Sequence, residues 1–116
     1  MTTQSTPTIN HISAIIKLES LSNSLDFIEN LGKAIIDGLE LTVVKKIDNK
    51  FEPIGRTLVY ILSESHLAIH TWPEYNTLHI DLVSCKDTTA SDFDRVLARA
   101  LKELKVIDYK SESHRI

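Results

Sequence analysis

The sequence predicts an α+β protein, a two-layer α/β sandwich with a largely antiparallel sheet and two helices on one face. Two segments carry apolar residues at the three- and four-residue spacing of an amphipathic helix, and the segments around them alternate with the two-residue period of a strand. The strand-like segments in the middle of the chain follow one another without a helix, which favours antiparallel pairing.

The 116 residues are expected to form one domain, because the chain shows no internal repeat and no linker. Its composition, 42% hydrophobic and 25% charged, is ordinary for a soluble globular protein, and no apolar run is long enough to span a bilayer. A net charge of -3 with scattered lysines argues against a nucleic-acid surface. The polar start, MTTQSTPT, lacks a secretory signal, so a cytoplasmic location is expected.

The first strand and the first helix follow from simple patterns. Residues 1–7 are polar and are expected to form a loose tail, and residues 10–18 alternate apolar and polar side chains as a strand does. Ser22 or Ser24 can cap a helix whose apolar stripe ends near Gly38. This helix is expected to cover one face of the sheet.

The middle of the chain is predicted to be sheet. A second strand is expected over residues 39–47, followed by a turn at Asp48 and Asn49, because these two residue types favour turns. Pro53 and Gly55 mark a further connection. Three more strands are predicted at residues 57–62, 66–72 and 78–82, with a turn at 73–76 between the last two.

The last part of the chain predicts a second helix. Ser91, followed three residues later by Asp94, resembles a capping box, and an apolar stripe of helical period runs over residues 93–104. Residues 106–109 are expected to add an edge strand. Residues 110–116 are polar and are expected to be loose.

The segment at residues 62–74, LSESHLAIHTWPE, is unusually polar for its strand-like surroundings. Buried polar groups cost stability unless they are satisfied or used. The hydroxyls of Ser63 and Ser65 beside two histidines would by themselves allow a serine hydrolase, but the GxSxG elbow of those enzymes is absent. His66 and His70 lie four apart in an expected strand, with no HExxH pattern, so no metal site is predicted.

Cys85 is the single cysteine of the chain, which excludes an internal disulfide and a zinc site built from cysteines. From the residues alone it is either a small buried hydrophobe or a functional thiol. With neither a nucleic-acid surface nor a disulfide framework indicated, a small-molecule function is favoured.

FEPIGRT occupies residues 51–57, LSESHLAIHTWPE follows at 62–74, and Asp81 and Cys85 come next. This order and spacing resembles the prokaryotic S-adenosylmethionine decarboxylase proenzyme family. The resemblance is close over residues 51–85 and looser elsewhere, and the expected order of strands and helices is compatible with that family's fold. It implies a self-processing enzyme whose cofactor is a covalently attached pyruvoyl group.

The resemblance assigns self-cleavage to the bond between Glu64 and Ser65. It implies that the Ser65 hydroxyl attacks the Glu64 carbonyl, that the peptide bond becomes an ester, and that elimination leaves a group that hydrolyses to pyruvoyl. The products would be a β chain of residues 1–64 and an α chain of residues 65–116. The substrate amine would then form a Schiff base with the pyruvoyl ketone, which accepts the electrons released with carbon dioxide.

The resemblance gives catalytic roles to three further residues. His70 is expected to handle the proton during processing, Thr57 to assist with its hydroxyl, and Cys85 to reprotonate the α-carbon after decarboxylation. From the residues alone, His70 also fits a hydrogen-bonded strand histidine and Thr57 an ordinary strand residue.

Substrate contacts are implied for three residues. Phe51 and Trp72 match positions that stack near an adenine ring, and Glu74 matches a carboxylate that takes the ribose hydroxyls. Alternatively, the two aromatic residues belong to the core and Glu74 to an exposed turn. The resemblance also implies S-adenosylmethionine as substrate, an aminopropyl donor for spermidine as product, and a homodimer whose active sites draw on both protomers.

The chain departs from the family pattern in two places. Residues 76–79, NTLH, replace a GYAA-like stretch, and Lys86 and Asp87 follow Cys85 where a glycine is frequent. These differences leave the substrate open, so pyruvoyl-dependent decarboxylation of arginine or ornithine stays an alternative. A non-processing regulatory homologue is a further alternative, although every residue assigned to processing is present.

Overall fold

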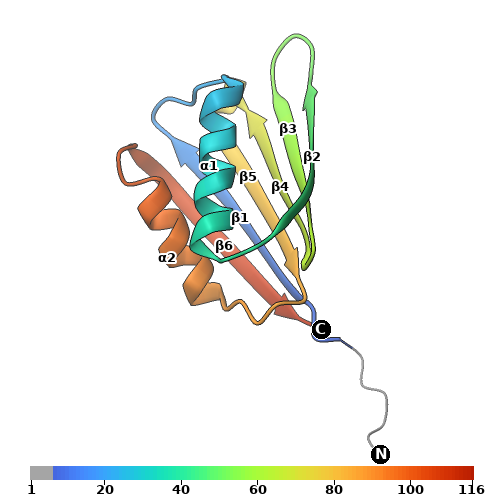
Figure 1. Ribbon diagram of the computed structural model, residues 1–116. Coiled ribbons are helices and arrows are strands. Elements are labelled where there is room, and N and C mark those ends of the chain that lie inside the picture. Colours follow the sequence, from blue (N-terminus) through green and yellow to red (C-terminus); the bar gives the residue numbers. More distant parts are fainter. Residues whose placement is uncertain (1–6) are drawn as a thin grey trace, which may run out of the picture.

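The computed structural model describes residues 7–116, so the tail expected over residues 1–7 lies outside this range except for Pro7. A single six-stranded sheet has the order β2-β3-β4-β5-β1-β6, and every neighbouring pair is antiparallel. Both helices lie on the same side of this sheet (Figure 1), which confirms the predicted α+β sandwich. The elements are β1 Asn10–Leu18, α1 Leu25–Gly38, β2 Val43–Lys50, β3 Arg56–Leu62, β4 Ser65–Trp72, the 3-10 turn η1 Pro73–Tyr75, β5 Thr77–Ser84, α2 Ala90–Ala100 and β6 Val106–Arg115.

The core lies between the sheet and the helices. Alternate residues of the central strands are buried, as Ile12 and Ile16 are in β1, and they pack against the apolar faces of α1 and α2. Helix α1 begins where expected, since the Ser24 hydroxyl accepts the N–H of Phe27 at 3.1 Å. Gly32 lets this helix approach the sheet closely, because a Cβ there would lie 2.6 Å from the ring of Tyr60.

The second strand is confirmed, but its predicted bounds and the turn predicted at Asp48 and Asn49 are wrong. Strand β2 begins at Val43 and continues through Asp48 and Asn49, which pair with Leu58 and Thr57 of β3. Polar residues are tolerated in this strand because it is an exposed sheet edge. The chain turns instead before Gly55, which has a φ of 110°.

The predicted cap of the second helix is displaced by two residues. The capping box is formed by Thr89 and Asp92, and the helix ends at Ala100 instead of continuing through the whole apolar stripe. Asp94 has a different role, because its carboxylate accepts hydrogen bonds from the hydroxyls of Tyr109 and Ser111 in β6.

The C-terminal segment is ordered, contrary to the expectation for residues 110–116. Strand β6 pairs with β1 over almost its whole length, and His114 lies opposite His11. The free edge of β1 offers backbone hydrogen bonds to this strand, and one polar face is acceptable at the edge of a sheet. Within residues 7–116, no helix is long and apolar enough to cross a membrane.

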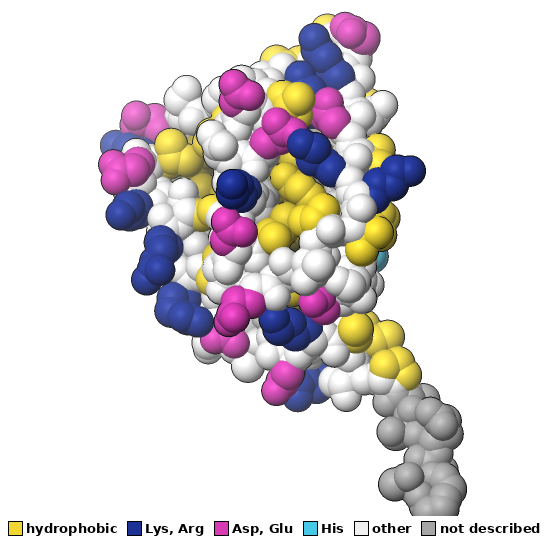
Figure 2. Space-filling model, viewed as in Figure 1, with side chains coloured by type: hydrophobic (Ala, Val, Ile, Leu, Met, Phe, Trp, Pro, Cys, Tyr) yellow, Lys and Arg dark blue, Asp and Glu magenta, His cyan; other side chains and the backbone are white. Residues whose placement is uncertain are grey.

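The two faces of the sheet differ in chemistry. Figure 2 looks onto the helix side, where basic and acidic side chains are interspersed and histidine is visible only at the margin. We use the term open face for the other side, which bears the side chains that alternate with the buried ones. Because strand partners share a face, all five histidines of the chain fall on it: His11, His66, His70, His79 and His114.

Candidate active site

The predicted cleavage bond lies in the tight hairpin between β3 and β4. Leu62 pairs with Ser65, so Ser63 and Glu64 form the two-residue turn. Ser65 has a φ of 144°, a backbone conformation that residues other than glycine rarely adopt. Such a conformation costs about 1–3 kcal/mol and is typical of functional sites. The strained residue is the one for which the family resemblance implies the role of nucleophile.

The carbonyl of Glu64 is held and polarised by a neighbouring strand. Ser65 also pairs with Ser84 at the end of β5, which brings the backbone N–H of Cys85 to 2.8 Å from the Glu64 oxygen. A backbone donor in this position stabilises negative charge that develops on the oxygen during nucleophilic attack. The Glu64 side chain accepts the N–H of Thr42 at 3.1 Å, which fixes the turn from its other side.

The thiol of Cys85 is exposed, so the interpretation as a buried hydrophobe is wrong. The loop that carries Cys85 is held by hydrogen bonds to residues of two strands, β5 and β1. The N–H of Lys86 donates to the Ser84 hydroxyl at 3.0 Å, and the amide of Asn10 donates to the Lys86 carbonyl at 2.8 Å. The thiol therefore lies on a fixed backbone next to the hairpin.

His70 and Thr57 are strand partners, and their side chains meet on the open face. The Thr57 hydroxyl lies 2.9 Å from Nδ1 of His70. Burial lowers the pKa of His70, the nearby His79 lowers it further, and Asp81 acts in the opposite direction. The net direction favours a neutral imidazole, which is the form that accepts a proton.

The rings of His70, His79 and Trp72 form a cluster. The centroid of the His70 ring lies 5.4 Å from that of His79 in a stacked arrangement and 6.1 Å from that of Trp72, and the centroids of Trp72 and His79 are 6.4 Å apart. A hollow of about 330 Å³ opens beside this cluster. It is lined by Ile15, Trp72, Tyr75, Thr77 and His79.

The two predicted stacking residues are not core aromatics. Phe51 is 49% exposed and Trp72 is 41% exposed, so both rings are available to a ligand. Glu74 lies exposed in the turn after β4. Its position is compatible both with the substrate contact and with the plain turn residue considered above.

The predicted residues form two groups at opposite ends of the sheet. The hairpin group consists of Glu64, Ser65 and Cys85, beside the β3–β4 turn. The histidine group lies towards the end that carries the β2–β3 and β4–β5 connections (Figure 1) and consists of Phe51, Thr57, His70, Trp72 and Glu74. Ser65 and His70 are five residues apart along one strand, which corresponds to about 16 Å at about 3.3 Å per residue. A single chain does not bring the two groups together.

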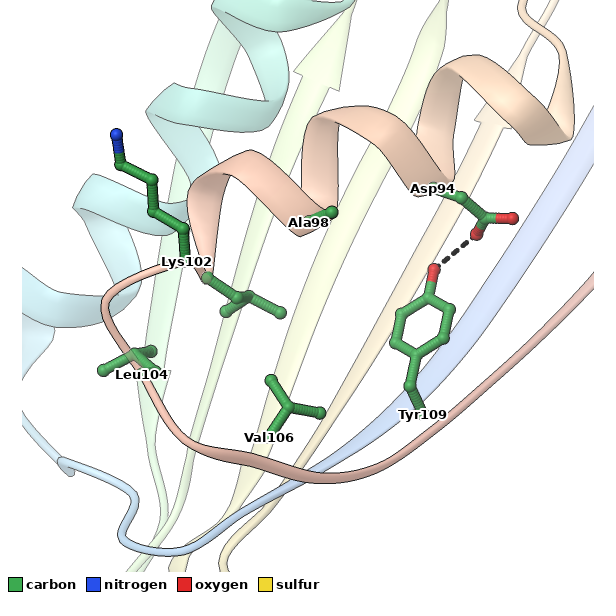
Figure 3. Close-up of a pocket in the computed structure, with 7 residues that line it drawn as sticks. Asp94, Ala98, Lys102, Leu104, Val106 and Tyr109 are labelled. Carbon is green, nitrogen blue, oxygen red and sulfur yellow. Dashed lines mark hydrogen bonds between the residues drawn. The ribbon is translucent and has the colours of Figure 1, made fainter.

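Another cavity lies elsewhere in the molecule. It also has a volume of about 330 Å³ and lies between α2 and β6, beside the hydrogen bond from Tyr109 to Asp94 (Figure 3). None of the predicted site residues lines it. Among residues 7–116, no three His, Cys, Asp or Glu side chains are grouped as metal ligands would be.

The sequence prediction missed three contributions to the site. The backbone N–H of Cys85, the ring of His79 and the hydroxyl of Ser13, which lies 2.8 Å from Nε2 of His79, were not assigned roles. A backbone donor leaves no trace in residue identity. The alternation of residues 77–82 places His79 and Asp81 on one face, but only the strand order shows which rings they meet.

The fold and site define a two-layer α+β sandwich with a strained serine in the hairpin between two central strands. The crystal structure of the adenosylmethionine decarboxylase from Aquifex aeolicus VF5 matches with a TM-score of 0.73 and 26% identity, covering 95% of this chain and 91% of that one. Residues 16–114 match the family model of S-adenosylmethionine decarboxylase.

Relatives agree with this assignment. An S-adenosylmethionine decarboxylase proenzyme from Archaeoglobus fulgidus is 33% identical over 92 residues, which cover 79% of this chain and 80% of the relative. Another from Thermoplasma volcanium is 41% identical over 71 residues, or 60% of this chain and 55% of the relative. The chain belongs to the S-adenosylmethionine decarboxylase family, which confirms the resemblance noted in its sequence.

Proposed function

We propose that this chain is a pyruvoyl-dependent S-adenosylmethionine decarboxylase that makes its own cofactor by cleavage between Glu64 and Ser65. The observation that carries the proposal is the hairpin, where a strained Ser65 follows a carbonyl that accepts the Cys85 N–H. The products are a β chain of residues 1–64 and an α chain of residues 65–116. The single domain 1–116 is thus a precursor.

The first step of processing is an acyl shift. In a homodimer, His70 of the partner subunit takes the proton of the Ser65 hydroxyl, and Oγ attacks the Glu64 carbonyl carbon while the Cys85 N–H stabilises the oxyanion. The carbon–nitrogen bond then breaks, and the nitrogen of residue 65 takes up the proton. An ester replaces the amide, which also releases the strain of the positive φ.

The second step breaks the chain. Removal of the α-proton of residue 65 expels the Glu64 carboxylate and leaves dehydroalanine at the new N-terminus. Addition of water and loss of ammonia convert this residue to the pyruvoyl group. The hydroxyl oxygen is therefore first nucleophile and then part of the leaving group, a role that Ala or Gly at position 65 could not fill.

In the mature enzyme, the two groups of residues also serve decarboxylation. The pyruvoyl carbonyl supplies the electron sink that accepts the electron pair left by carbon dioxide. The exposed thiol of Cys85 delivers a proton to the substrate α-carbon. Phe51 and Trp72 stack on the adenine of S-adenosylmethionine, and Glu74 accepts its ribose hydroxyls. The product is the aminopropyl donor for spermidine, and the expected cytoplasmic location stays a prediction.

A homodimer follows from the separation of the two groups. The reacting atoms must approach to about 3 Å for proton transfer, whereas Ser65 and His70 of one chain lie about 16 Å apart. A two-fold dimer formed through the open faces would place the hairpin group of one protomer against the histidine group of its partner. The exposed Ile15, Ile47 and Ile61 support such an interface, since they lie on or beside this face.

The intact mass of purified protein tests self-cleavage. The wild-type chain should separate into fragments ending at Glu64 and beginning at residue 65, and Ser65→Ala should stay full length. Ser63→Ala in the same turn is the matched control and should cleave normally. A wild-type chain that stays intact would favour the non-processing homologue, and cleavage of Ser65→Ala would exclude Ser65 as nucleophile.

Coexpression of two inactive variants tests the shared site. Ser65→Ala keeps a normal histidine group, and His70→Ala keeps a normal hairpin group. In a mixed dimer the His70→Ala chain should be cut, because the partner subunit's His70 serves it, while each variant alone stays intact. If both chains stay intact in verified mixed dimers, the site does not draw on both protomers.

The substrate is tested on the matured enzyme. Carbon dioxide release should be measured from S-adenosylmethionine, arginine and ornithine at equal concentrations. The exposed aromatic pair predicts a clear preference for the adenosyl substrate. Faster release from arginine or ornithine would replace this assignment with the alternative one on the same scaffold.

A further inference from the structure

We propose that His79 is a positioning residue for His70: its ring, stacked on His70 and held by Ser13, fixes the His70 ring and keeps it uncharged for self-cleavage. The inference rests on the proposed role of His70 in processing. His79 itself does not contact the cleavage bond, since it lies in the histidine group at the other end of the sheet.

The geometry confines His70 from both neighbouring strands. His70 of β4 pairs with Thr57 of β3 on one side and with His79 of β5 on the other. The Thr57 hydroxyl lies 2.9 Å from Nδ1, and the His79 ring stacks at a centroid distance of 5.4 Å with an interplanar angle of 18°. A hydrogen bond and a stacked ring together restrict rotation of the imidazole, which leaves Nε2 for proton transfer.

The position of His79 is itself fixed. Its Nε2 lies 2.8 Å from the hydroxyl of Ser13 in β1, and its ring centroid lies 6.4 Å from that of Trp72. Ser13 therefore holds His79 from the strand beyond β5. The chain of contacts runs across four neighbouring strands: Thr57, His70, His79 and Ser13.

Few charged side chains lie near the stacked rings of His70 and His79. On the open face His79 faces Ile15 of β1, and Lys110 of β6 faces Ile15 from the far side. Asp81 is the nearest carboxylate in its strand, and its Oδ1 is engaged by Nε2 of His11 at 2.7 Å.

Two stacked imidazoles cannot both carry a proton without strong repulsion in a half-buried site. Burial is the larger cause of the lowered pKa of His70, and His79 adds to it. His79 thus extends the range of pH over which His70 is a proton acceptor.

Titration of the His70 ring by NMR separates position from charge. The Ser65→Ala chain serves as the background, because it cannot cleave itself and its site stays in the precursor form during the measurement. Adding His79→Phe keeps a stacked ring and removes the second imidazole, and the His70 midpoint should move to higher pH. His114→Gln removes an imidazole from the edge strand and should leave the midpoint unchanged. An unchanged midpoint in His79→Phe would overturn the proposal.

Cleavage kinetics in the chain with Ser65 intact provide the second readout. His79→Phe should match the wild-type rate at pH 8 and fall about three- to tenfold below it at pH 6, because more of His70 is protonated. His79→Ala loses the stacking ring and should be slower at both pH values. Thermal unfolding of each variant verifies that the fold is retained. Wild-type pH profiles for both variants would exclude a positioning role.

The two experiments distinguish this inference from the proposed function. If the wild-type chain does not cleave at any pH but the NMR midpoint moves, the proposed function fails while the coupling of the two rings stands. If cleavage proceeds and the midpoint does not move, the coupling fails while the proposed function stands.

Discussion

Cys85 takes part in the proposed chemistry through two different groups, its backbone N–H and its thiol. The N–H holds the Glu64 carbonyl, whereas the thiol is exposed beside the hairpin. Cys85→Ser keeps the N–H and should cleave, but its hydroxyl is a far weaker acid, so decarboxylation should fall about 10²- to 10⁴-fold. Intact mass and carbon dioxide release measure the two effects. A Cys85→Ser chain that fails to cleave would show that the thiol is needed in processing.

Candidate site residues could be proposed from the sequence, but their grouping could not. Ser65, His70 and Cys85 are candidates because the segments that contain them resemble the family's motifs in order and spacing. Their separation into two groups depends on strand pairing, since Ser65 meets Ser84 whereas His70 meets His79. Residue spacing alone does not specify this register.

At the level of elements, β6 and α2 are joined by the hydrogen bond from Tyr109 to Asp94 (Figure 3). Tyr109→Phe should lower the free energy of unfolding by about 1–2 kcal/mol, because it leaves the carboxylate without this donor. Tyr75→Phe, at an exposed ring, is the control and should change stability by less than about 0.5 kcal/mol. Denaturant unfolding at pH 7 measures both. Equal stability of the two variants would contradict the importance of this bond.

The Tyr109 bond also predicts a dependence on alkaline pH. Burial raises the pKa of Tyr109, and the hydrogen bond to Asp94 raises it further. Because the pKa is raised in the folded state, the protonated Tyr109 hydroxyl makes its full contribution to the free energy of unfolding below the ordinary tyrosine pKa of about 10. This contribution is lost as the pH rises further. The stability difference between wild type and Tyr109→Phe should therefore shrink above about pH 10.

The existence of both edge strands was predicted, but their bounds were less accurate than those of β1 and α1, which have one clear apolar face. β1 and α1 each bury one side, so their period identifies them. β2 and β6 are edge strands with few buried residues, and their formation depends on the free backbone groups of β3 and β1. The cap of α2 was misplaced because two Ser/Thr and Asp pairs, 89/92 and 91/94, have the same spacing.

For the whole molecule, the histidines of the open face predict a pH-sensitive dimer. All five lie on the face that we propose as the interface, and each imidazole that binds a proton adds a positive charge to that face. The dimer should weaken reversibly on acidification, because charged groups on two facing sheets repel each other. Light scattering after size-exclusion chromatography at pH 8 and pH 5.5 measures this. The same mass at both pH values would contradict the expectation.

The strand order predicts how the processed enzyme unfolds. The proposed β chain contains β1, β2 and β3, while the α chain contains β4, β5 and β6, and the order β2-β3-β4-β5-β1-β6 interleaves them. The fragments should stay together without a covalent link, because strand pairs β3–β4, β5–β1 and β1–β6 join them.

Unfolding of the mature protein should consequently depend on its concentration, since the two fragments separate when the sheet opens. Ser65→Ala, which keeps the fragments in one chain, should lack the part of this dependence that comes from fragment separation. Thermal unfolding over a hundredfold range of concentration, at a pH where both proteins have the same oligomeric state, compares them. Identical dependence would show that the fragments do not separate.

The hydrogen bond from Cys85 to the Glu64 carbonyl joins two residues that meet only after β4 and β5 have paired. An unfolded chain lacks this donor and also lacks the constrained turn at Ser65. The proposed cut would then be a one-way event that a chain undergoes only after its sheet has assembled. Cleavage would mark the molecules that have folded, and misfolded copies would lack the group needed to act on substrate.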